Sequence, residues 1–266
     1  MLLPRLATAA VGLPIVVALI LLGGAPYAIV LALIIFGAVV ELASAAGLRS
    51  RLPEVLLSAA LAAGLAPAAY ANRDVTGALL AGAVAVPLLS AVWRADVTPS
   101  DRPPVWLVLP AAALYAGWLG HYLMPVRRLP QGDRWTLLLI LGTFATDSGA
   151  YAVGRLLGRH KLAPRVSPGK TIEGAIGGLA AAIGAVVGLD YLLQLPHRPL
   201  LIVALGAALS VAAQAGDLAE SAVKRRLGVK DMGRLFPGHG GIMDRFDSLL
   251  FTGPVLYFLV TWTILR

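Results

Sequence analysis

Acidic and basic side chains follow one helical face in the segment AGDLAESAVKRR, which continues an apolar stretch. Four polar residues recur there at spacings of i, i+3, i+4 and i+7: Asp217, Glu220, Ser221 and Lys224. An α-helix brings residues at these spacings onto one face, so the carboxylates and the cation form a single stripe. A polar stripe on a buried helix predicts a functional site rather than lipid contact.

A second pair of carboxylates lies in the segment MDRFDS, close to the predicted start of the last helix. Asp244 and Asp247 are three residues apart. At that spacing they can hold a hard divalent cation through oxygen and leave coordination sites for phosphate and water. The same acids could instead cap the helix, with Arg245 as an ion-pair partner, and this alternative stays open. Together with Asp217, the pair favours a metal site.

Glycines surround a histidine between these two acidic segments, in the sequence FPGHGG. Gly238, Gly240 and Gly241 would let backbone N–H groups approach an anion, and His239 could donate to phosphate or transfer a proton. A flexible turn explains the glycines nearly as well. The cations around the segment are Lys224, Arg225, Arg226, Lys230 and Arg234. They indicate a phosphate-bearing substrate, although attraction to anionic lipid headgroups would also account for them.

The segment GRLLGRHKLAPRVSPGKTIEGAIGG supplies a further candidate cation. Ser167 as N-cap and Pro168 in the first turn would start a helix, whose free N–H groups, together with Lys170 and Thr171, favour an anion. The pieces GRLLG and GAIGG place glycines four residues apart. That spacing is typical of closely packed helices rather than of chemistry.

The composition assigns these residues to a membrane protein. Of the 266 residues, 58% are hydrophobic and only 14% are charged, and the mean hydropathy is +0.81. These values lie outside the range of soluble domains. Without cysteine, disulfides and thiolate sites are excluded. Although the net charge is +8, the sequence has no basic helix interleaved with aromatic residues, so we expect no nucleic-acid partner.

Spanning helices need roughly 20 apolar residues each. Nine segments of the chain meet this requirement and predict an all-α, polytopic fold: 6–22, 26–47, 55–72, 75–93, 105–124, 135–154, 172–195, 199–223 and 248–265. We expect the first to be an uncleaved helix rather than a signal peptide. The simplest organisation is one membrane domain over 1–266, with accessory helices in 1–134 and the catalytic helices and loops in 135–266.

Lysine and arginine are distributed unequally between the two sides of this predicted bundle. Nine spans place sixteen of the 22 on the side of the N-terminus, including those in 155–170 and 224–245. Cytoplasmic loops carry the excess of Lys and Arg, so we expect the N-terminus and both candidate site loops in the cytoplasm.

Three acids are the clearest inside the predicted spans, Glu41, Asp147 and Asp217, whereas Asp190 lies near the outer end of its span and is expected at the membrane interface. Each of the three precedes the cytoplasmic end of its helix by about six or seven residues, which places it ~9–11 Å deep at ~1.5 Å per residue. Matching depth predicts one polar cavity that faces the cytoplasm. Independent polar contacts between helices, with neighbours such as Thr146, are the alternative.

The segment SAVKRRLGVKDMGRLFPGHGGIMDRFD closely resembles the signature of the phosphatidate cytidylyltransferases, also called CDP-diacylglycerol synthases. The matching residues are Ser221, Lys224, Arg225, Lys230, Asp231, Pro237, His239, Gly240, Gly241, Asp244, Arg245 and Asp247. The upstream pieces TDSGAYAVGR, SPGKTIEG and GDLAES also look like motifs of this family. The resemblance covers roughly residues 140–250, and the first ~135 residues add little beyond hydrophobicity and Glu41.

This resemblance implies transfer of CMP from CTP to phosphatidic acid, with Mg²⁺ as cofactor and room for a second cation. The implied catalytic residues are Asp217, Lys224, Arg225, His239, Asp244 and Asp247, of which the three aspartates hold the metal. The implied substrate-binding residues are Asp147, Lys170, Ser221, Lys230, Gly240, Gly241 and Arg245. The family further suggests a homodimer in the inner or plasma membrane of the cell.

Two alternatives predict different behaviour. A CDP-archaeol synthase or a CTP-dependent lipid kinase would apply similar chemistry to another lipid. An anion transporter would use its intramembrane acids for ion coupling, but transporters are typically built from related halves with sites near the midplane. The acids here cluster toward one predicted face, and the sequence has no visible repeat.

The charge distribution makes a prediction about topology. Because the chain has no cysteine, the variants Arg159→Cys and Arg234→Cys each carry a single thiol whose labelling can be measured separately. We expect both to be protected from a membrane-impermeant thiol reagent in intact cells and labelled in broken ones. Labelling of either from outside would overturn the orientation.

Overall fold

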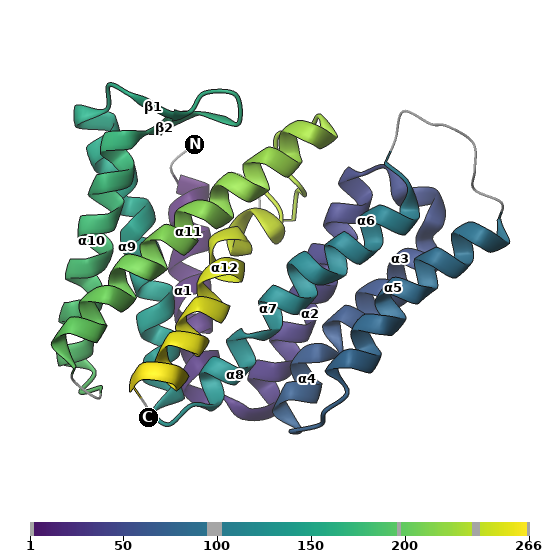
Figure 1. Ribbon diagram of the computed structural model, residues 1–266, viewed down its shortest axis with the longest axis horizontal. Coiled ribbons are helices and arrows are strands. Elements are labelled where there is room, and N and C mark those ends of the chain that lie inside the picture. Colours follow the sequence, from purple (N-terminus) through teal and green to yellow (C-terminus); the bar gives the residue numbers. More distant parts are fainter. Residues whose placement is uncertain (1–2, 95–102, 196–197, 236–239, 265–266) are drawn as a thin grey trace. The chain divides into compact units, whose positions relative to one another are not determined.

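The computed structural model describes residues 3–94, 103–195, 198–235 and 240–264 (Figure 1). Over these residues the chain is mainly α-helical and divides into two compact units. Unit 1 comprises Met1–Pro125 and Val229–Phe246, and unit 2 comprises Val126–Gly228 and Asp247–Arg266. The organisation predicted from the sequence, one membrane domain with catalytic residues in 135–266, stays a prediction.

Unit 1 is built from apolar helices around α2. Its helices are α1 (Leu3–Leu22), α2 (Gly24–Ala45), α3 (Leu52–Ala63), α4 (Leu65–Tyr70), α5 (Thr76–Trp93), α6 (Val105–Ala112) and α7 (Leu119–His121). A 3₁₀ turn η1 (Leu48–Arg51) and a π-helical segment η2 (Ala113–Trp118) complete it, and α8 (Leu123–Arg128) leads into unit 2. Helix α2 packs against α3, α4 and α6, and α3 packs against α5. Short residues such as Ala62 and Gly117 allow close approach between these helices.

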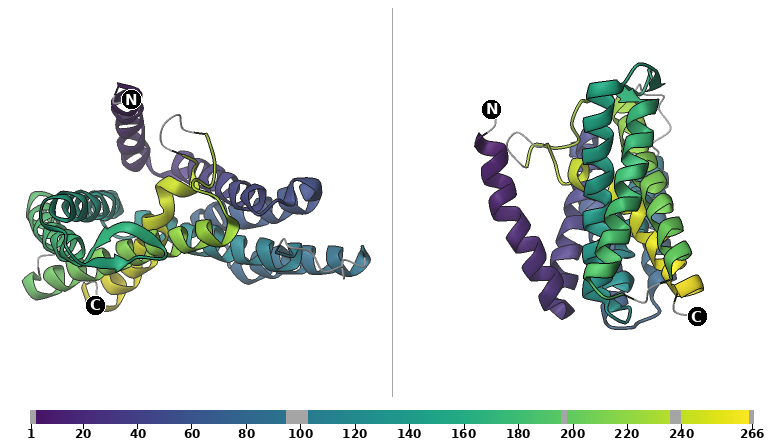
Figure 2. Two further views of the ribbon diagram at one scale, coloured as in Figure 1. Left: turned by 90° about the horizontal axis from the view of Figure 1, so that it is seen from above. Right: turned by 90° about the vertical axis from the view of Figure 1, so that its left-hand side faces the viewer.

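Unit 2 is a bundle in which α10 packs against both α9 and α11 (Figure 2). Its elements are α9 (Gly132–Leu157), β1 (Lys161–Ala163), β2 (Ser167–Thr171), α10 (Ile172–Leu192), α11 (Pro199–Leu227), the larger part of α12 (Met243–Leu259) and the π-helical segment η3 (Val260–Ile264). Helix α12 is tied to α9 by a hydrogen bond from the Thr143 hydroxyl to the Thr252 hydroxyl at 3.3 Å. It passes Gly216 of α11 so closely that a side chain there would meet the backbone of Asp247.

The spans predicted from hydrophobicity correspond to helices throughout the described residues. Each of the nine predicted ranges contains helix there, and seven helical segments are long and apolar enough to cross a membrane. The all-α polytopic class is therefore confirmed, and the chain is a membrane protein. The count of nine spans and the side on which a cavity opens stay predictions.

The prediction that Ser167 caps a helix was wrong. Residues Ser167–Thr171 form strand β2, which pairs antiparallel with β1 in a hairpin at one end of α9 and α10 (Figures 1 and 2). Helix α10 starts four residues later, with Thr171 as its N-cap. The ring of Pro168 favours extended backbone at Ser167 in a strand as well as at a helix N-cap, so the proline is compatible with both structures.

Glycines pack α9 against α10, as the four-residue spacings predict. The backbone of Gly154 lies against Gly174, where added Cβ atoms would come within 3.1–3.4 Å of the opposite glycine. At Gly178 a Cβ atom would lie 2.8 Å from the backbone oxygen of Thr146. A helix backbone cannot move away from such a contact without repacking, so these positions determine how closely α9 and α10 approach.

A substitution pair on α10 tests this packing. We expect Gly178→Ala to lower the free energy of unfolding by roughly 1–3 kcal/mol through overpacking, which corresponds to about 5 °C in melting temperature. Gly184 of the same helix has no neighbour within 4 Å of an added Cβ. Gly184→Ala should therefore be neutral or slightly stabilising. Equal melting temperatures for the two variants in detergent would contradict the packing described here.

Candidate active site

A cavity of about 420 Å³ in unit 2 is lined by four charged side chains together with polar and apolar ones. Helix α9, the hairpin, α10 and α11 all line it. Its polar lining includes Asp147, Tyr151, Arg155, Lys170, Gln214 and Asp217. Of the three acids predicted to share one cavity, Asp147 and Asp217 both line this one, whereas Glu41 belongs to unit 1 and is not part of its lining. A polar cavity of this volume is large enough for a small charged ligand.

Two of the lining residues form an ion pair. The Lys170 Nζ atom of strand β2 is 2.7 Å from the Asp217 Oδ2 atom of α11. The two side chains are 23% and 37% exposed, so water screens the pair only in part. The sequence predicts Lys170 as the cation of an anion site. In the structure Lys170 pairs with Asp217, which the sequence analysis assigned to metal binding.

Hydrogen bonds hold the hairpin that carries Lys170 at its junction with α10 and connect it to α11. The Thr171 hydroxyl accepts the Gly174 N–H at 3.1 Å, which caps α10 directly after the strand. The Arg225 Nε–H donates to the Val166 carbonyl at 3.2 Å. A guanidinium has five donors, so Arg225 keeps others for a ligand.

Glu173 holds the other end of the hairpin by hydrogen bonds, where the chain leaves α9. Its carboxylate accepts the backbone N–H of Arg159 at 3.0 Å and that of His160 at 3.2 Å, and it bonds the His160 ring at 2.6 Å. These bonds join the start of α10 to the segment before β1. Together with the Thr171 cap, they restrict the direction in which Lys170 points.

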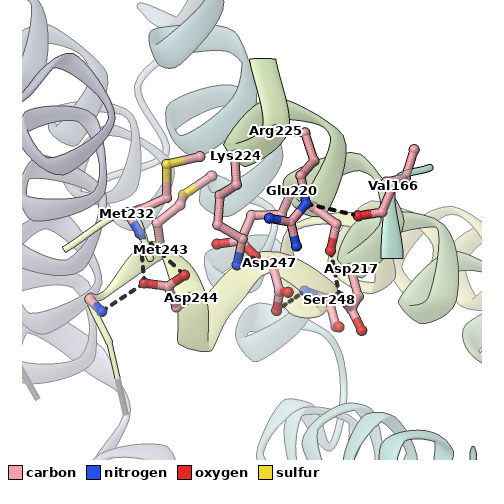
Figure 3. Close-up of polar contacts among 12 residues, drawn as sticks. Val166, Asp217, Glu220, Lys224, Arg225, Met232, Met243, Asp244, Asp247 and Ser248 are labelled. Atoms are coloured by element: carbon pink, nitrogen blue, oxygen red, sulfur yellow. Dashed lines mark hydrogen bonds and ion pairs between the residues drawn. The ribbon is translucent and has the colours of Figure 1, made fainter. Parts of the chain in front are cut away.

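A second group of charges follows Asp217 along α11, as the predicted stripe requires. Glu220 is almost fully buried and pairs with Lys224 one turn further on. Asp247 of α12 lies near Glu220 and within electrostatic range of both Asp217 and Lys224 (Figure 3). The Ser221 hydroxyl is 3.5 Å from Asp217. Carboxylates from two helices and a lysine therefore converge beside the cavity wall.

Sequence reasoning missed three cavity-lining residues, Tyr151, Arg155 and Gln214. The Arg155 guanidinium donates to the Tyr151 hydroxyl at 2.8 Å and lies over its ring. The Gln214 amide donates to the Ala175 carbonyl at 3.2 Å. A usable signal existed for the first two: Asp147, Tyr151 and Arg155 recur every four residues, which places them on one face of α9.

Asp244 belongs to unit 1 and accepts hydrogen bonds from its own loop. The Met232 N–H donates to its Oδ2 atom at 3.0 Å, and the Gly241 N–H donates to the same atom at 2.8 Å (Figure 3). Gly240 has a φ of +82°, which favours glycine, and a Cβ there would meet the Asp244 carboxylate. Asp244 therefore organises the loop before α12, whatever else it binds.

The remaining predicted residues fall into two groups. Lys230 and Arg245 are exposed in unit 1. His239, Pro237 and Gly238 lie outside the described residues. The predicted pairing of Asp217 with Asp244 at one metal joins the two units and stays a prediction.

The chain is similar to known cytidylyltransferases. A model described as "Cytidylyltransferase family" matches residues 3–263. A phosphatidate cytidylyltransferase of Bacillus subtilis is 46% identical over 150 residues, which are 56% of each chain.

Staphylococcal proteins with the same name show a similar match. The Staphylococcus epidermidis protein is 46% identical over 133 residues, 50% of this chain and 51% of that one. The Staphylococcus aureus protein is 44% identical over 130 residues, 49% of this chain and 50% of that one. The chain thus spans about half the length of the curated relatives it matches.

The Lys170–Asp217 pair makes a prediction about stability. In a double-mutant cycle of Lys170→Met and Asp217→Asn, we expect a coupling of about 1 kcal/mol, because the pair is partly exposed. Asp133, in the first turn of α9, provides the control. Lys170→Met and Asp133→Asn should be additive in thermal unfolding. Additivity between Lys170→Met and Asp217→Asn would contradict the pair.

Proposed function

The chain belongs to the cytidylyltransferase family, and from this premise we propose that it transfers CMP from CTP to phosphatidic acid. The products are CDP-diacylglycerol and pyrophosphate. A phosphate oxygen of the lipid attacks the α-phosphorus of CTP, and the bond from that phosphorus to the bridging oxygen of the β-phosphate breaks. Pyrophosphate leaves with the electron pair of that bond.

The observation that carries the proposal is the polar cavity of unit 2, with Lys170 and Asp217 paired in its wall. The lipid phosphate is already a nucleophile, so the protein needs no strong base. Its task is to bring two polyanions together and to stabilise the charge that develops on the α-phosphoryl group and on pyrophosphate. Lys170, Lys224 and Arg225 are the cations that we propose contact these phosphates, while Asp147 lines the same cavity.

The carboxylates of unit 2 fit a magnesium ion. Mg²⁺ prefers one or two protein carboxylates and completes its octahedron with substrate phosphates and water. Asp217 and Asp247 offer such a pair from two helices. Among the described residues no group of three or more His, Cys, Asp and Glu side chains is placed for a metal. When bound, the ion would neutralise phosphate charge and align the attack.

The remaining parts of the proposal come from the signature. Asp244 would be a further metal ligand, since its backbone hydrogen bonds use only part of a carboxylate's acceptor capacity. His239, Ser221, Lys230, Gly240, Gly241 and Arg245 would bind substrate phosphates. We place the site on the cytoplasmic side of the plasma membrane, where CTP is available, and we propose a homodimer.

Labelled CTP provides the test. Purified protein in detergent with phosphatidic acid and Mg²⁺ should move label from [α-³²P]CTP into lipid, and label from [γ-³²P]CTP should appear in pyrophosphate only. Transfer should require phosphatidic acid and stop with EDTA. Lipid labelled by [γ-³²P]CTP would indicate a kinase, and CMP transfer only to an archaeol phosphate would indicate the other relative. No transfer from either label would leave the transporter alternative.

Within the same assay, Asp217→Asn should reduce CMP transfer by about 100-fold or more, roughly 3 kcal/mol of lost transition-state stabilisation. Asp133→Asn changes the same functional group in the first turn of α9, outside the cavity lining, and should leave transfer within about twofold of wild type. Equal activities of the two folded variants would remove Asp217 from the site.

A further inference from the structure

A glutamate near the cytoplasm-facing end predicted for α2 caps a helix that lies 202 residues further along the chain. The Glu41 Oε2 atom accepts the backbone N–H of Met243 at 3.0 Å, and Met243 is the first residue of α12. The first N–H groups of a helix have no partner within the helix, and they carry partial positive charge. Glu41 supplies the missing acceptor and a negative charge from another helix of unit 1.

The loop before α12 is shaped around this carboxylate. A methyl group at Gly233 or at Gly241 would overlap the Glu41 carboxylate, so both positions approach it without a side chain. Ile242 extends over Gly37, one turn before Glu41 on α2, where an added Cβ would overlap its side chain. The loop therefore contacts the Gly37–Glu41 face of α2 through a hydrogen bond, two glycines and one apolar side chain.

Glu41 and Asp244 bind neighbouring parts of the same short segment. Asp244 accepts the N–H of Gly241, and Glu41 accepts the N–H of Met243. The backbone that connects Gly241 to Asp244 is thus held by a carboxylate from α2 and by a carboxylate of its own. Loss of the Glu41 contact would free the first turn of α12 and, with it, the direction of the Asp244 side chain.

We propose that Glu41 is a positioning residue for the transfer reaction: by capping α12 in unit 1, it holds Asp244 in the orientation that binds metal and phosphate. This inference rests on the proposed function of Asp244. It gives a chemical role to the segment before residue 135, in which the sequence offers little besides hydrophobicity. Glu41 itself acts through the backbone of Met243 and does not touch the reacting atoms.

The first experiment compares three single variants in the purified protein. Glu41→Ala removes the acceptor, and Glu41→Gln keeps an oxygen that can accept the Met243 N–H. Glu54→Ala is the matched control, because Glu54 is a glutamate of unit 1 that pairs with Arg51 and Arg94 instead of the loop. For each variant, kcat for CMP transfer and the Mg²⁺ concentration at half-maximal rate are measured.

We expect Glu41→Ala to lower kcat and to raise the half-saturating Mg²⁺ concentration by about 10-fold or more, the usual effect of removing a partner that orients a metal ligand. Glu41→Gln should retain most of the activity, and Glu54→Ala should keep the wild-type Mg²⁺ dependence even where it lowers thermal stability. Wild-type Mg²⁺ dependence in Glu41→Ala would overturn the proposal. Equal loss in Glu41→Gln and Glu41→Ala would also overturn it, in favour of direct metal binding by Glu41.

A second measurement uses the rate of tryptic cleavage, rather than activity, to test how firmly the loop is held. Lys230 and Arg234 are exposed in the loop, so trypsin can cleave after either of them. Loss of the cap should speed cleavage there by roughly fivefold in Glu41→Ala, in proportion to the lost capping energy. Glu41→Gln and Glu54→Ala should be cleaved at the wild-type rate. An unchanged cleavage rate in Glu41→Ala would overturn the proposed anchor.

A third variant approaches the contact from its other side. The Gly233→Ala methyl would displace the Glu41 carboxylate, which is the free end of a flexible side chain. Gly233→Ala should therefore lower kcat and raise the half-saturating Mg²⁺ concentration as Glu41→Ala does. The double variant of Glu41→Ala and Gly233→Ala should lose no more CMP-transfer activity than either single variant. Additive losses would overturn the shared mechanism. A wild-type protein that transfers no CMP would refute the proposed function, whereas the cleavage rates would still test the Glu41 anchor.

Discussion

The ion pair between Lys170 and Asp217 is the interaction that the hairpin, α10 and α11 of unit 2 jointly position. A charge among apolar helices needs a partner, because desolvation costs several kcal/mol when it is left unpaired. Lys170 reaches Asp217 from a short hairpin, which must leave α9, turn and enter α10 in a fixed direction. The Thr171 cap, the Glu173 bonds and the close glycine contacts between α9 and α10 each contribute to that direction.

Glu41 and the carboxylates of the α11 stripe are satisfied in different ways, and the difference has a chemical consequence. In unit 2, Asp217 pairs with Lys170, and Glu220 pairs with Lys224. Such pairs can exchange partners. When a metal and phosphates bind, the carboxylate can bind the metal and the lysine can bind a phosphate, so few charges are left unpaired. In unit 1, Glu41 accepts a backbone N–H, whose direction is fixed by the chain. Backbone-bound acids therefore hold geometry, and cation-paired acids suit ligand exchange.

Local periodicity predicted the features of the chain that are local. Apolar runs located the helices, and the i, i+3, i+4, i+7 spacing located the stripe from Asp217 to Lys224. The hairpin was missed because its strands have only three and five residues, and because Pro168 also suits the first turn of a helix. The partners of Lys170 and Glu41 were missed because contacts between distant segments leave no periodic signal. Glu41 and Met243 are 202 residues apart.

The long-range contact of Glu41 bears on why the family pattern extends over the whole chain. The family model matches residues 3–263, far beyond the segment that carries the signature. Hydrophobicity alone would let the N-terminal helices vary freely, since lipid contact accepts many apolar side chains. A carboxylate that meets the first turn of α12 must stand at one position of α2, and Gly37, Gly233 and Gly241 must lack side chains to make room for the contact. The helices of unit 1 are thus tied to the signature by geometry that apolar composition cannot supply.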